Sequence, residues 1–445
     1  MKMKRFLSAC LVAVLMWTSL SPDALAFCGF YVAKADTALY NEASQVAIAK
    51  DGSRTVLTMA NDFKGEVKDF AMVVPVPVLL QEDQVHVGDP TILKRLDDFS
   101  APRLVEYFDE NPCQVFRKSL DRELSAVPSS APLQESRTEA DLGVTVEAQF
   151  TVGEYDIVIL SAKESNGLQT WLNHNGYKIP RGARSLLKPY IRQNMKFFVA
   201  KVNLEEFEKS EFQKLRPLQM AFDSPKFMLP IRLGMINANA EQDLIVYLLS
   251  PKGQAELVNY RTANIPTDAE IPEFVKDEFG EFYTAMFETA HVKAGKRVAF
   301  REYAWDMSNC DPCSATPLNP EELRKAGVFW LPERPQGDFV VPPRSTGVFI
   351  TRLHVRYSRD KFPEDLVFQE TSNRQLFQGR YVMRHPYKQE ADCPAGRRYK
   401  RSLPVRFEKE AQTLAKLTGW TIQDIRQKMD FQTPKPEPWW KRLWK

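Results

Sequence analysis

Short apolar runs separated by turn residues recur along the chain, and this pattern predicts β-strands. Two runs flank the turn Asp51-Gly52-Ser53 and two flank Gly153-Glu154, so each pair is expected to form an antiparallel hairpin. The expected strands are 45–49, 55–59, 70–74, 144–151, 156–160, 196–202, 218–222, 244–249, 297–303, 347–357 and 380–384. Pro75 and Pro77 follow the third strand, which favours an edge strand or an extended exit from the sheet because proline donates no ladder hydrogen bond.

Apolar residues at helical spacing predict helices between these strands. The clearest helix spans 272–290, where one stripe contains Val275, Phe279, Phe282, Met286 and Ala290. Shorter helices are expected at 92–99, at 168–172 and at 186–191, the last kinked or restarted by Pro189, and two more lie on either side of Gly419. Because strands and helices do not alternate regularly, we predict an α+β protein with largely antiparallel sheets, interspersed helices and a helical C-terminal end.

A change in composition predicts the domain organisation. Residues 125–142 are rich in Ser, Pro, Glu and Arg and poor in apolar side chains, as is typical of a linker or mobile loop. We therefore expect two subdomains, a β-rich N-terminal one at 27–124 and a main α+β domain at 143–430. A tail rich in tryptophan and basic residues follows at 431–445.

The first 26 residues have the three parts of a cleavable signal peptide. Three cations precede an apolar stretch at 6–20, and small residues at 24 and 26 place the expected cleavage after Ala26. The stretch is shorter than the roughly 20 residues of a membrane-spanning helix. The alternative of a lipoprotein anchor is disfavoured because Cys10 lies too early and bulky Phe27 precedes Cys28. The sequence thus predicts an exported protein, periplasmic or secreted.

Net charge narrows the range of partners. Cleavage after Ala26 lowers the formal net charge from +3 to +1, so there is no electrostatic case for a nucleic-acid partner. The last residues instead combine tryptophans with cations, which favours peripheral contact with a membrane interface; the alternative is a loose tail whose tryptophans dock on their own domain. The membrane-interface candidates are Trp439, Trp440, Lys441, Arg442, Trp444 and Lys445.

Cysteines remaining after cleavage are expected to form disulfides, because an exported protein folds in an oxidising compartment. The five candidates are Cys28, Cys113, Cys310, Cys313 and Cys393. Sequence order favours a bond between Cys28 and Cys113. In the second group either Cys310 bonds to Cys313, or one of these two bonds to Cys393, and one thiol is left over.

The sharpest local motif is Cys310-Asp311-Pro312-Cys313. A redox-active pair of this kind sits at the start of a helix, where the helix dipole favours a thiolate. Here the next helix begins several residues later, with Asn319 as its cap and Pro320 in its first turn. A structural disulfide is therefore favoured, and the alternatives are a metal site with Cys393 and a histidine such as His385, and redox catalysis.

No catalytic, nucleotide or metal motif rises above background in the sequence. There is no HExxH, GxSxG, GxGxxG or phosphate-loop pattern, and His174 suits the end of a helix better than a catalytic role. A hydrolase built from scattered residues stays open, because a catalytic triad needs no local motif. We predict no catalytic residue, no cofactor-binding residue and no cofactor, and a non-enzymatic role is favoured over an enzyme.

Four ordered segments carry a family resemblance. They are Cys28-Gly29-Phe30-Tyr31, the stretch 69–77 (DFAMVVPVP), Cys310-Asp311-Pro312-Cys313 and Arg384-His385-Pro386. Together they resemble a bacterial exported family known only as a domain of unknown function, over most of the mature chain. The resemblance implies export and a shared fold, and it brings no activity and no catalytic residues.

The favoured function is therefore that of an exported cell-envelope protein that binds a ligand or partner or has a structural role. The alternatives are an extracytoplasmic enzyme, either thiol-disulfide or hydrolytic, and a metal-handling protein. The sequence does not identify the envelope partner or ligand.

Overall fold

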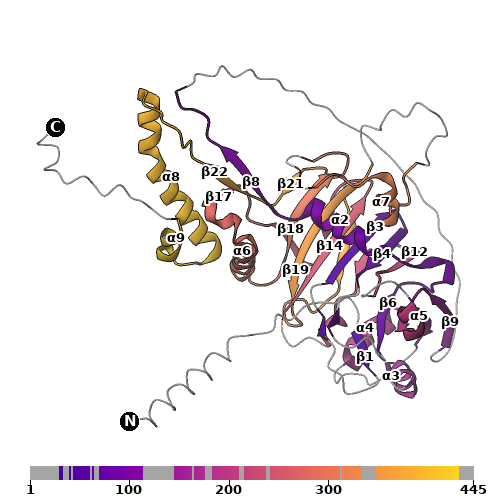
Figure 1. The fold of residues 1–445 in the computed structure, drawn as a ribbon. Coiled ribbons are helices and arrows are strands. Elements are labelled where there is room, and N and C mark those ends of the chain that lie inside the picture. The colour runs from indigo at the N-terminus through magenta and orange to yellow at the C-terminus, as the bar shows by residue number, and fades with distance from the viewer. Residues whose placement is uncertain are drawn as a thin grey trace, which may run out of the picture.

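The computed structural model describes most of the chain. The described residues are 30–33, 40–41, 44–60, 63–64, 70–113, 145–162, 165–175, 183–209, 215–236, 241–310, 313, 315–332 and 347–429. Figure 1 shows three regions: a central sheet, a smaller sheet with α3 and α4 at one end, and a layer containing α6, α8 and α9 at the other. The described part has mostly antiparallel sheets with interspersed helices and a helical C-terminal end, so the predicted α+β class is confirmed.

A nine-stranded sheet forms the centre of the molecule, in the order β16-β18-β19-β14-β3-β4-β12-β7, with β21 also pairing with β18. Its strands are β3 (Ser44–Asp51), β4 (Arg54–Met59), β7 (Val85–Val87), β12 (Leu218–Asp223), β14 (Gln242–Ser250), β16 (Arg261–Asn264), β18 (Val298–Asp306), β19 (Phe349–Tyr357) and β21 (Phe377–Gln378). Residue alternation along β3 shows how the sheet is covered on both faces. Val46 and Ile48 belong to one apolar cluster and Ala47 and Ala49 to another.

A five-stranded sheet packs on one face of the central sheet, in the order β1-β6-β11-β10-β9. Its strands are β1 (Phe30–Ala33), β6 (Phe70–Val76), β9 (Thr145–Val152), β10 (Tyr155–Ser161) and β11 (Lys196–Val202). Met72, Val74 and Phe198 of this sheet share a buried cluster with Val46 and Ile48. Its other face is covered by α3 (Ser165–His174) and α4 (Ala183–Arg192), whose leucines bury against the same strands.

The opposite face of the central sheet is covered by α2 (Pro90–Ser100), whose apolar residues pack on Ala47, Ala49 and Tyr247. A three-stranded parallel sheet, β17-β22-β8, lies beyond it with α6 (Phe279–Lys293), α8 (Pro394–Thr418) and α9 (Ile422–Lys428). Its strands are β8 (Arg103–Phe108), β17 (Ala269–Glu270) and β22 (Arg380–His385). Phe282, Tyr381 and Leu414 join these helices and strands in one buried cluster.

Short elements complete the described chain. They are β2 (Tyr40–Asn41), β5 (Phe63–Lys64), β13 (Met228–Leu229), β15 (Ala255–Leu257), β20 (Leu366–Glu370), α5 (Leu204–Lys209), α7 (Pro320–Lys325), η1 (Glu82–Gln84), η2 (Gly234–Ile236) and η3 (Glu273–Lys276). No helix among the described residues is long and apolar enough to cross a membrane.

Two predicted helices differ from the observed ones. The stripe at 272–290 begins as the 3-10 turn η3, and α6 starts only at Phe279, because Glu278 has a non-helical backbone. Pro189 does not break α4, which runs through it without interruption. At the C-terminal end, Gly419 closes α8 in the left-handed conformation and Thr421 caps α9, as the sequence predicts.

The prolines after residue 74 have a simple place in the sheet. Pro75 lies within β6 opposite Phe197 of β11, whereas β1 pairs only with residues 70–73 on the other side. Within the described residues, Pro75 therefore has a strand partner on one side only, which a residue without an N–H tolerates.

Strand pairing crosses the predicted subdomain boundary. The central sheet joins β3 and β4 to β12 and β14, and the five-stranded sheet joins β6 to β11. The sheets therefore do not divide at the predicted linker 125–142, which lies outside the described residues.

Candidate functional site

The pairing of β8 with β22 determines which cysteines meet. The two strands run parallel, with Phe108 opposite His385, so the chain leaves both strands in the same direction. Cys113 and Cys393 follow within a few residues, and they are joined by a disulfide with their Cα atoms 5.9 Å apart. The predicted bond between Cys28 and Cys113 was therefore wrong. The order of cysteines along the chain does not show which of them lie close together, because parallel strands bring distant segments side by side. Cys28 lies outside the described residues.

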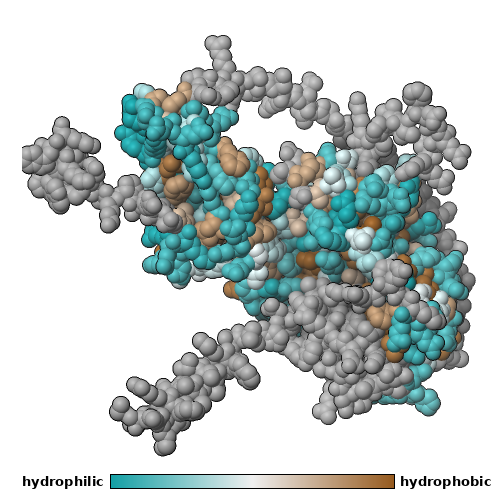
Figure 2. All heavy atoms as spheres, in the orientation of Figure 1, coloured by the Kyte–Doolittle hydropathy of each residue, from teal (hydrophilic) through white to brown (hydrophobic). Residues whose placement is uncertain are grey.

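Strand β8 is the last strand of its sheet and exposes two aromatic side chains. Among the described residues no strand pairs with its outer edge. Phe108 is 72% exposed and Tyr107 is 44% exposed. Apolar residues gather on this face in Figure 2 at the position where Figure 1 draws β8. Exposed aromatic groups on an open strand edge are unusual on a soluble surface and mark a binding site or an aggregation hazard.

Side chains of the neighbouring strand β22 contact both aromatic rings. The ring of Phe108 stacks on that of His385 with centroids 4.5 Å apart, and the guanidinium of Arg384 lies 5.6 Å from the ring of Tyr107. His385 Nε2 is 2.8 Å from the Glu106 carboxylate. The hydrogen bond from Lys276 and the contact with His385 hold the pKa of Glu106 below its ordinary value. The edge is thus a fixed arrangement of rings and charges.

Helix α8 begins beside this edge. Cys393 is its N-cap residue, and the Cys393 sulfur accepts a 3.2 Å hydrogen bond from the backbone N–H of Gly396. Gly396 is packed so tightly that a Cβ atom there would collide with the backbone carbonyl of Ala391. Four exposed cations follow in the first turns, namely Arg397, Arg398, Lys400 and Arg401. The disulfide therefore lies at a helix N-terminus that four cations follow.

Polar contacts near the disulfide also join β8 to α8. Asp109 accepts hydrogen bonds of 2.6 Å from the hydroxyl of Tyr399 and 2.5 Å from Arg406. Arg406 in turn lies 3.4 Å from the buried carboxylate of Glu410. Burial raises the pKa of Glu410 to about 7, against the opposing effect of Arg406 and with help from the nearby carboxylate of Glu270.

A second polar assembly is buried under α2 and α6. We call it the buried ion cluster; its members are Asp97, Asp243, Tyr283, Glu288, Glu302, Arg352, His354 and Arg356. Glu302 contacts Arg352 Nε at 2.6 Å and His354 Nδ1 at 2.9 Å, and the Glu302 side chain is fully buried. The cluster ties the central sheet to both helices.

Interactions within the buried ion cluster favour the charged forms of Glu302, His354 and Asp243. Burial alone would raise the pKa of Glu302, but Arg352 and His354 lower it to about 2. Burial alone would lower the pKa of His354, yet Glu302 and Asp243 raise it above its ordinary value. Asp243 has a pKa well below its ordinary value for the same reason, since His354 and Arg356 outweigh its burial. Each of these charged groups therefore has an oppositely charged partner within the cluster.

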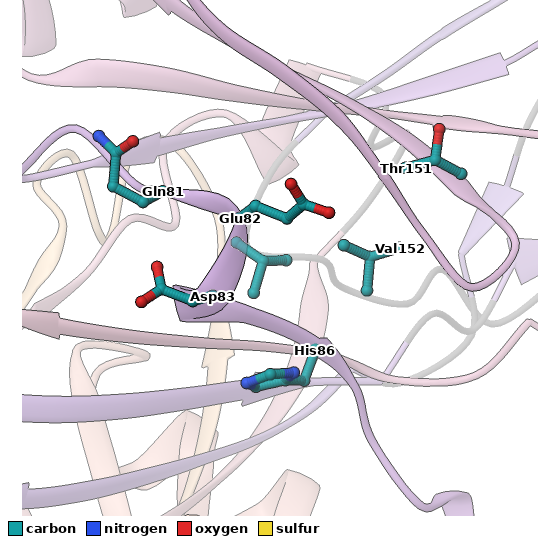
Figure 3. A pocket seen from close by; sticks show the side chains of 7 residues that line it. Gln81, Glu82, Asp83, His86, Thr151 and Val152 are labelled. Atoms are coloured by element: carbon teal, nitrogen blue, oxygen red, sulfur yellow. The ribbon is translucent and has the colours of Figure 1, made fainter.

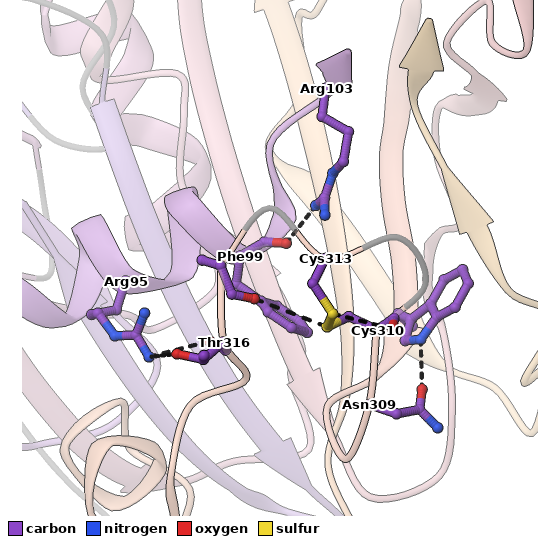
Figure 4. The surroundings of a disulfide bond; sticks show 9 residues. Arg95, Phe99, Arg103, Asn309, Cys310, Cys313 and Thr316 are labelled. Atoms are coloured by element: carbon purple, nitrogen blue, oxygen red, sulfur yellow. Dashed lines mark hydrogen bonds between the residues drawn. A yellow bond between two sulfur atoms is a disulfide. The ribbon is translucent and has the colours of Figure 1, made fainter. Parts of the chain in front are cut away.

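The other disulfide joins Cys310 to Cys313. Cys310 packs partly buried against the apolar cluster under α2, and Cys313 is exposed. Figure 4 shows Arg95, Phe99 and Thr316 around it, and Arg95 donates a 3.2 Å hydrogen bond to the backbone oxygen of Thr316. The alternative of a metal site formed with Cys393 and His385 was wrong, because Cys393 is bonded to Cys113 and His385 stacks on Phe108.

The described surface also has open hollows. The one in Figure 3 measures about 660 Å³, with Glu82, Asp83 and His86 on one side and the hairpin residues Thr151 and Val152 on the other. Another, of about 500 Å³, lies where α9 approaches α6. No group of three or more His, Cys, Asp or Glu side chains among the described residues is arranged to hold a metal ion.

The remaining predicted residues do not join a site in the described part. His174 is the last, exposed residue of α3. The six candidates for membrane contact at 439–445 lie outside the described residues, so their role stays a prediction.

Sequence reasoning missed both the β8 edge and the buried ion cluster. The cluster had a signal, since Arg352, His354 and Arg356 alternate along an otherwise apolar strand and must share one face. Tyr107 and Phe108 gave no such signal, because an aromatic pair at the end of a strand is equally typical of a buried strand.

The chain matches a family model. The family model described as "Uncharacterized protein conserved in bacteria (DUF2330)" matches residues 22–369. No curated protein and no solved structure matches the chain. The match spans most of the central and five-stranded sheets, and the residues at Cys310 and Cys313 fall within it, whereas β22 and α8 follow it. Because the match covers well over half of the sequence, the chain belongs to this family of uncharacterised bacterial proteins.

Proposed function

We propose that this protein is an exported cell-envelope protein that binds an acidic, extended segment of a partner polypeptide along β8. The observation that carries the proposal is the open edge of β8 with its exposed Tyr107 and Phe108. An extended peptide can add a strand to such an edge, with main-chain hydrogen bonds giving affinity and side chains giving selectivity.

Charge favours an acidic partner over a neutral or basic one. Exposed Arg398, Lys400 and Arg401 in the first turns of α8 have no hydrogen-bond or ion-pair partner among the described residues. The disulfide between Cys113 and Cys393 keeps these cations next to the end of β8. A partner strand continuing along β8 would run past them, and carboxylates on that strand would be attracted.

Export is supported by the two disulfides and by the N-terminal sequence. Disulfides persist in oxidising compartments and are rare in the bacterial cytosol. The bond between Cys113 and Cys393 closes a loop with a sequence separation of 280, so it constrains nearly the whole fold.

The binding proposal is tested with a fluorescently labelled random copolymer of glutamate and tyrosine. This probe is an acidic polypeptide with aromatic side chains. Fluorescence anisotropy should show saturable binding to the wild-type mature protein. The double variant Y107A/F108A should bind about tenfold more weakly, because truncating central aromatic groups of an interface typically costs more than 1 kcal/mol. V258A is the matched control, since Val258 is a 52% exposed apolar residue in the loop after β15.

Two results would overturn the binding proposal. One is unchanged affinity of Y107A/F108A for the copolymer. The other is equally tight binding of vesicles containing phosphatidylglycerol that depends on the same residues, because the surface would then recognise a lipid headgroup layer. A neutral Ser-Gly copolymer should show no binding in either case.

Export is tested separately by cell fractionation and N-terminal sequencing of the natural protein. We expect a periplasmic or secreted chain that begins at Phe27. A cytosolic chain that still begins at Met1, with its cysteines reduced, contradicts the proposal.

A further inference from the structure

The two disulfides of the described chain differ in what surrounds their sulfur atoms. The Cys393 sulfur faces the backbone N–H of Gly396 at 3.2 Å. The sulfurs of the other pair face carbonyl oxygens instead, with Cys313 Sγ 3.2 Å from the Cys310 oxygen and Cys310 Sγ 3.9 Å from the Ala315 oxygen. An N–H donor favours a thiolate at its position, whereas a carbonyl oxygen disfavours one.

The surroundings of Cys393 and Cys310 also differ in their helix ends and charges. Cys393 caps the 25-residue helix α8, and Arg397, Arg398, Lys400 and Arg401 follow within its first turns. A helix N-terminus and nearby cations are the two features that stabilise thiolates in reactive cysteines. Cys310 is not at the start of a helix, because α7 begins only at Pro320. Two guanidinium groups lie beside this disulfide in Figure 4, but both are held by other acceptors, that of Arg95 by Glu322 and that of Arg103 by the backbone oxygen of Phe99.

The two cysteines of the Cys113–Cys393 disulfide also differ in solvent exposure. Cys113 is exposed, whereas Cys393 is only partly exposed. A thiolate arriving from solvent therefore meets the Cys113 sulfur first, and Cys393 is the sulfur that must leave. Exchange is fastest when the leaving sulfur is the better stabilised thiolate.

We propose that the Cys113–Cys393 disulfide is a thiol–disulfide exchange site for an incoming small or protein thiol. The thiolate of that compound attacks Cys113 Sγ, a mixed disulfide forms on Cys113, and Cys393 leaves as a thiolate at the start of α8. A second thiol attacks the mixed disulfide, so two thiols are oxidised to a disulfide and both cysteines are reduced. The proposal does not depend on the binding of a polypeptide along β8.

Opening this bond leaves β8 and α8 in contact. Asp109 still accepts hydrogen bonds from Tyr399 and Arg406, and the parallel pairing of β8 with β22 does not involve the sulfur atoms. The two cysteines therefore stay close after reduction, and the bond can form again.

The test uses the full mature protein and limiting reduced glutathione near neutral pH. Samples are quenched with N-ethylmaleimide at intervals and analysed by peptide mass mapping. We expect a glutathione adduct on Cys113 first, with Cys393 alkylated in the same molecules and Cys310–Cys313 still intact. The proposal is overturned if Cys310–Cys313 opens first or at the same rate, or if the first adduct is on Cys393.

A variant with fewer cations tests whether charge, and not exposure alone, makes the Cys113–Cys393 disulfide open faster. R397Q/R398Q should slow the opening of Cys113–Cys393 at least about threefold at low salt, and the difference should shrink at high salt. K409Q/K416Q removes two exposed cations from later turns of the same helix and is the matched control. Equal rates for R397Q/R398Q and K409Q/K416Q contradict the proposed role of the helix start.

A second measurement reports on Cys393 itself. In C113A the free Cys393 should react with iodoacetamide in mildly acidic buffer, where Cys310 in C313A reacts slowly. If C113A does not fold, the glutathione time course of the wild-type protein still decides between the outcomes.

Discussion

Glu302 accepts a 2.6 Å hydrogen bond from Nε of Arg352 across two neighbouring strands, and both side chains are buried. The pair lies at the centre of the buried ion cluster, which connects the central sheet to α2 and α6. A buried charge whose partner is removed keeps its desolvation cost without the compensating attraction. Removing either partner is therefore expected to destabilise the described fold.

Replacing Glu302 should strongly destabilise the protein. We expect E302Q to lower the free energy of unfolding by about 3–5 kcal/mol, because Arg352 and His354 lose their shared carboxylate. Urea denaturation followed by circular dichroism measures this. The control is D223N, which removes the partner of Arg54 in a pair with both side chains 60% exposed and should cost under about 1 kcal/mol. Similar decreases in the free energy of unfolding of E302Q and D223N would show that the buried ion cluster has no special role in stability.

The effect of Glu302 should depend on pH in one direction. Its pKa is lowered in the folded state to about 2 from an ordinary value of 4.5, so its contribution is fully present above about pH 4.5. That contribution is lost as pH falls toward 2. The difference in unfolding free energy between wild type and E302Q should therefore shrink as pH falls from about 4.5 toward 2. A difference that grows below pH 4 contradicts this assignment.

Glu410 should give the opposite pH dependence. Its folded-state pKa is raised to about 7, so the folded protein binds a proton that the unfolded chain has released. Stability relative to E410Q should therefore fall as pH rises from about 4.5 through 7. Thermal unfolding of wild type and E410Q at several pH values measures this, and taking the difference removes the contribution of His354. If the two proteins respond equally to pH, Glu410 is ionised at lower pH than the structure indicates.

The two disulfides should differ in their contribution to stability. In the chain-entropy model, the bond with a sequence separation of 280 contributes about 5.6 kcal/mol and the bond with a separation of 3 about 2 kcal/mol. C113A/C393A should thus unfold at a lower temperature than C310A/C313A under non-reducing conditions. A larger decrease in the unfolding temperature of C310A/C313A would mean that the short disulfide loop positions the segment above α2.

Several elements followed from local patterns because their causes are local. The hairpin around Asp51-Gly52-Ser53 was predicted correctly, since Gly52 adopts the positive φ of +59° that the turn needs. The start of α9 was also predicted from its capping pair, Thr421 and Asp424. The beginning of α6 was missed, because the apolar stripe at 272–290 runs on through the 3-10 turn before it.

The candidate site followed from the sequence only in part. The cysteines were recognised as disulfide partners, but the pairing of Cys113 with Cys393 depends on the parallel register of β8 and β22. That register joins segments more than 270 residues apart, and no local pattern encodes it. The exposure of Phe108 likewise depends on which strand ends the sheet.

The sequence by itself determined the α+β class, most strand positions, the caps of the last helices and the membership of an uncharacterised bacterial family, because alternation, turn residues and ordered motifs are written in neighbouring positions. Only the tertiary structure decided that β8 ends its sheet, that Cys393 caps α8 against Cys113, and that Glu302 lies between Arg352 and His354. These features arise from packing between distant segments, where burial and charge pairing depend on which surfaces meet.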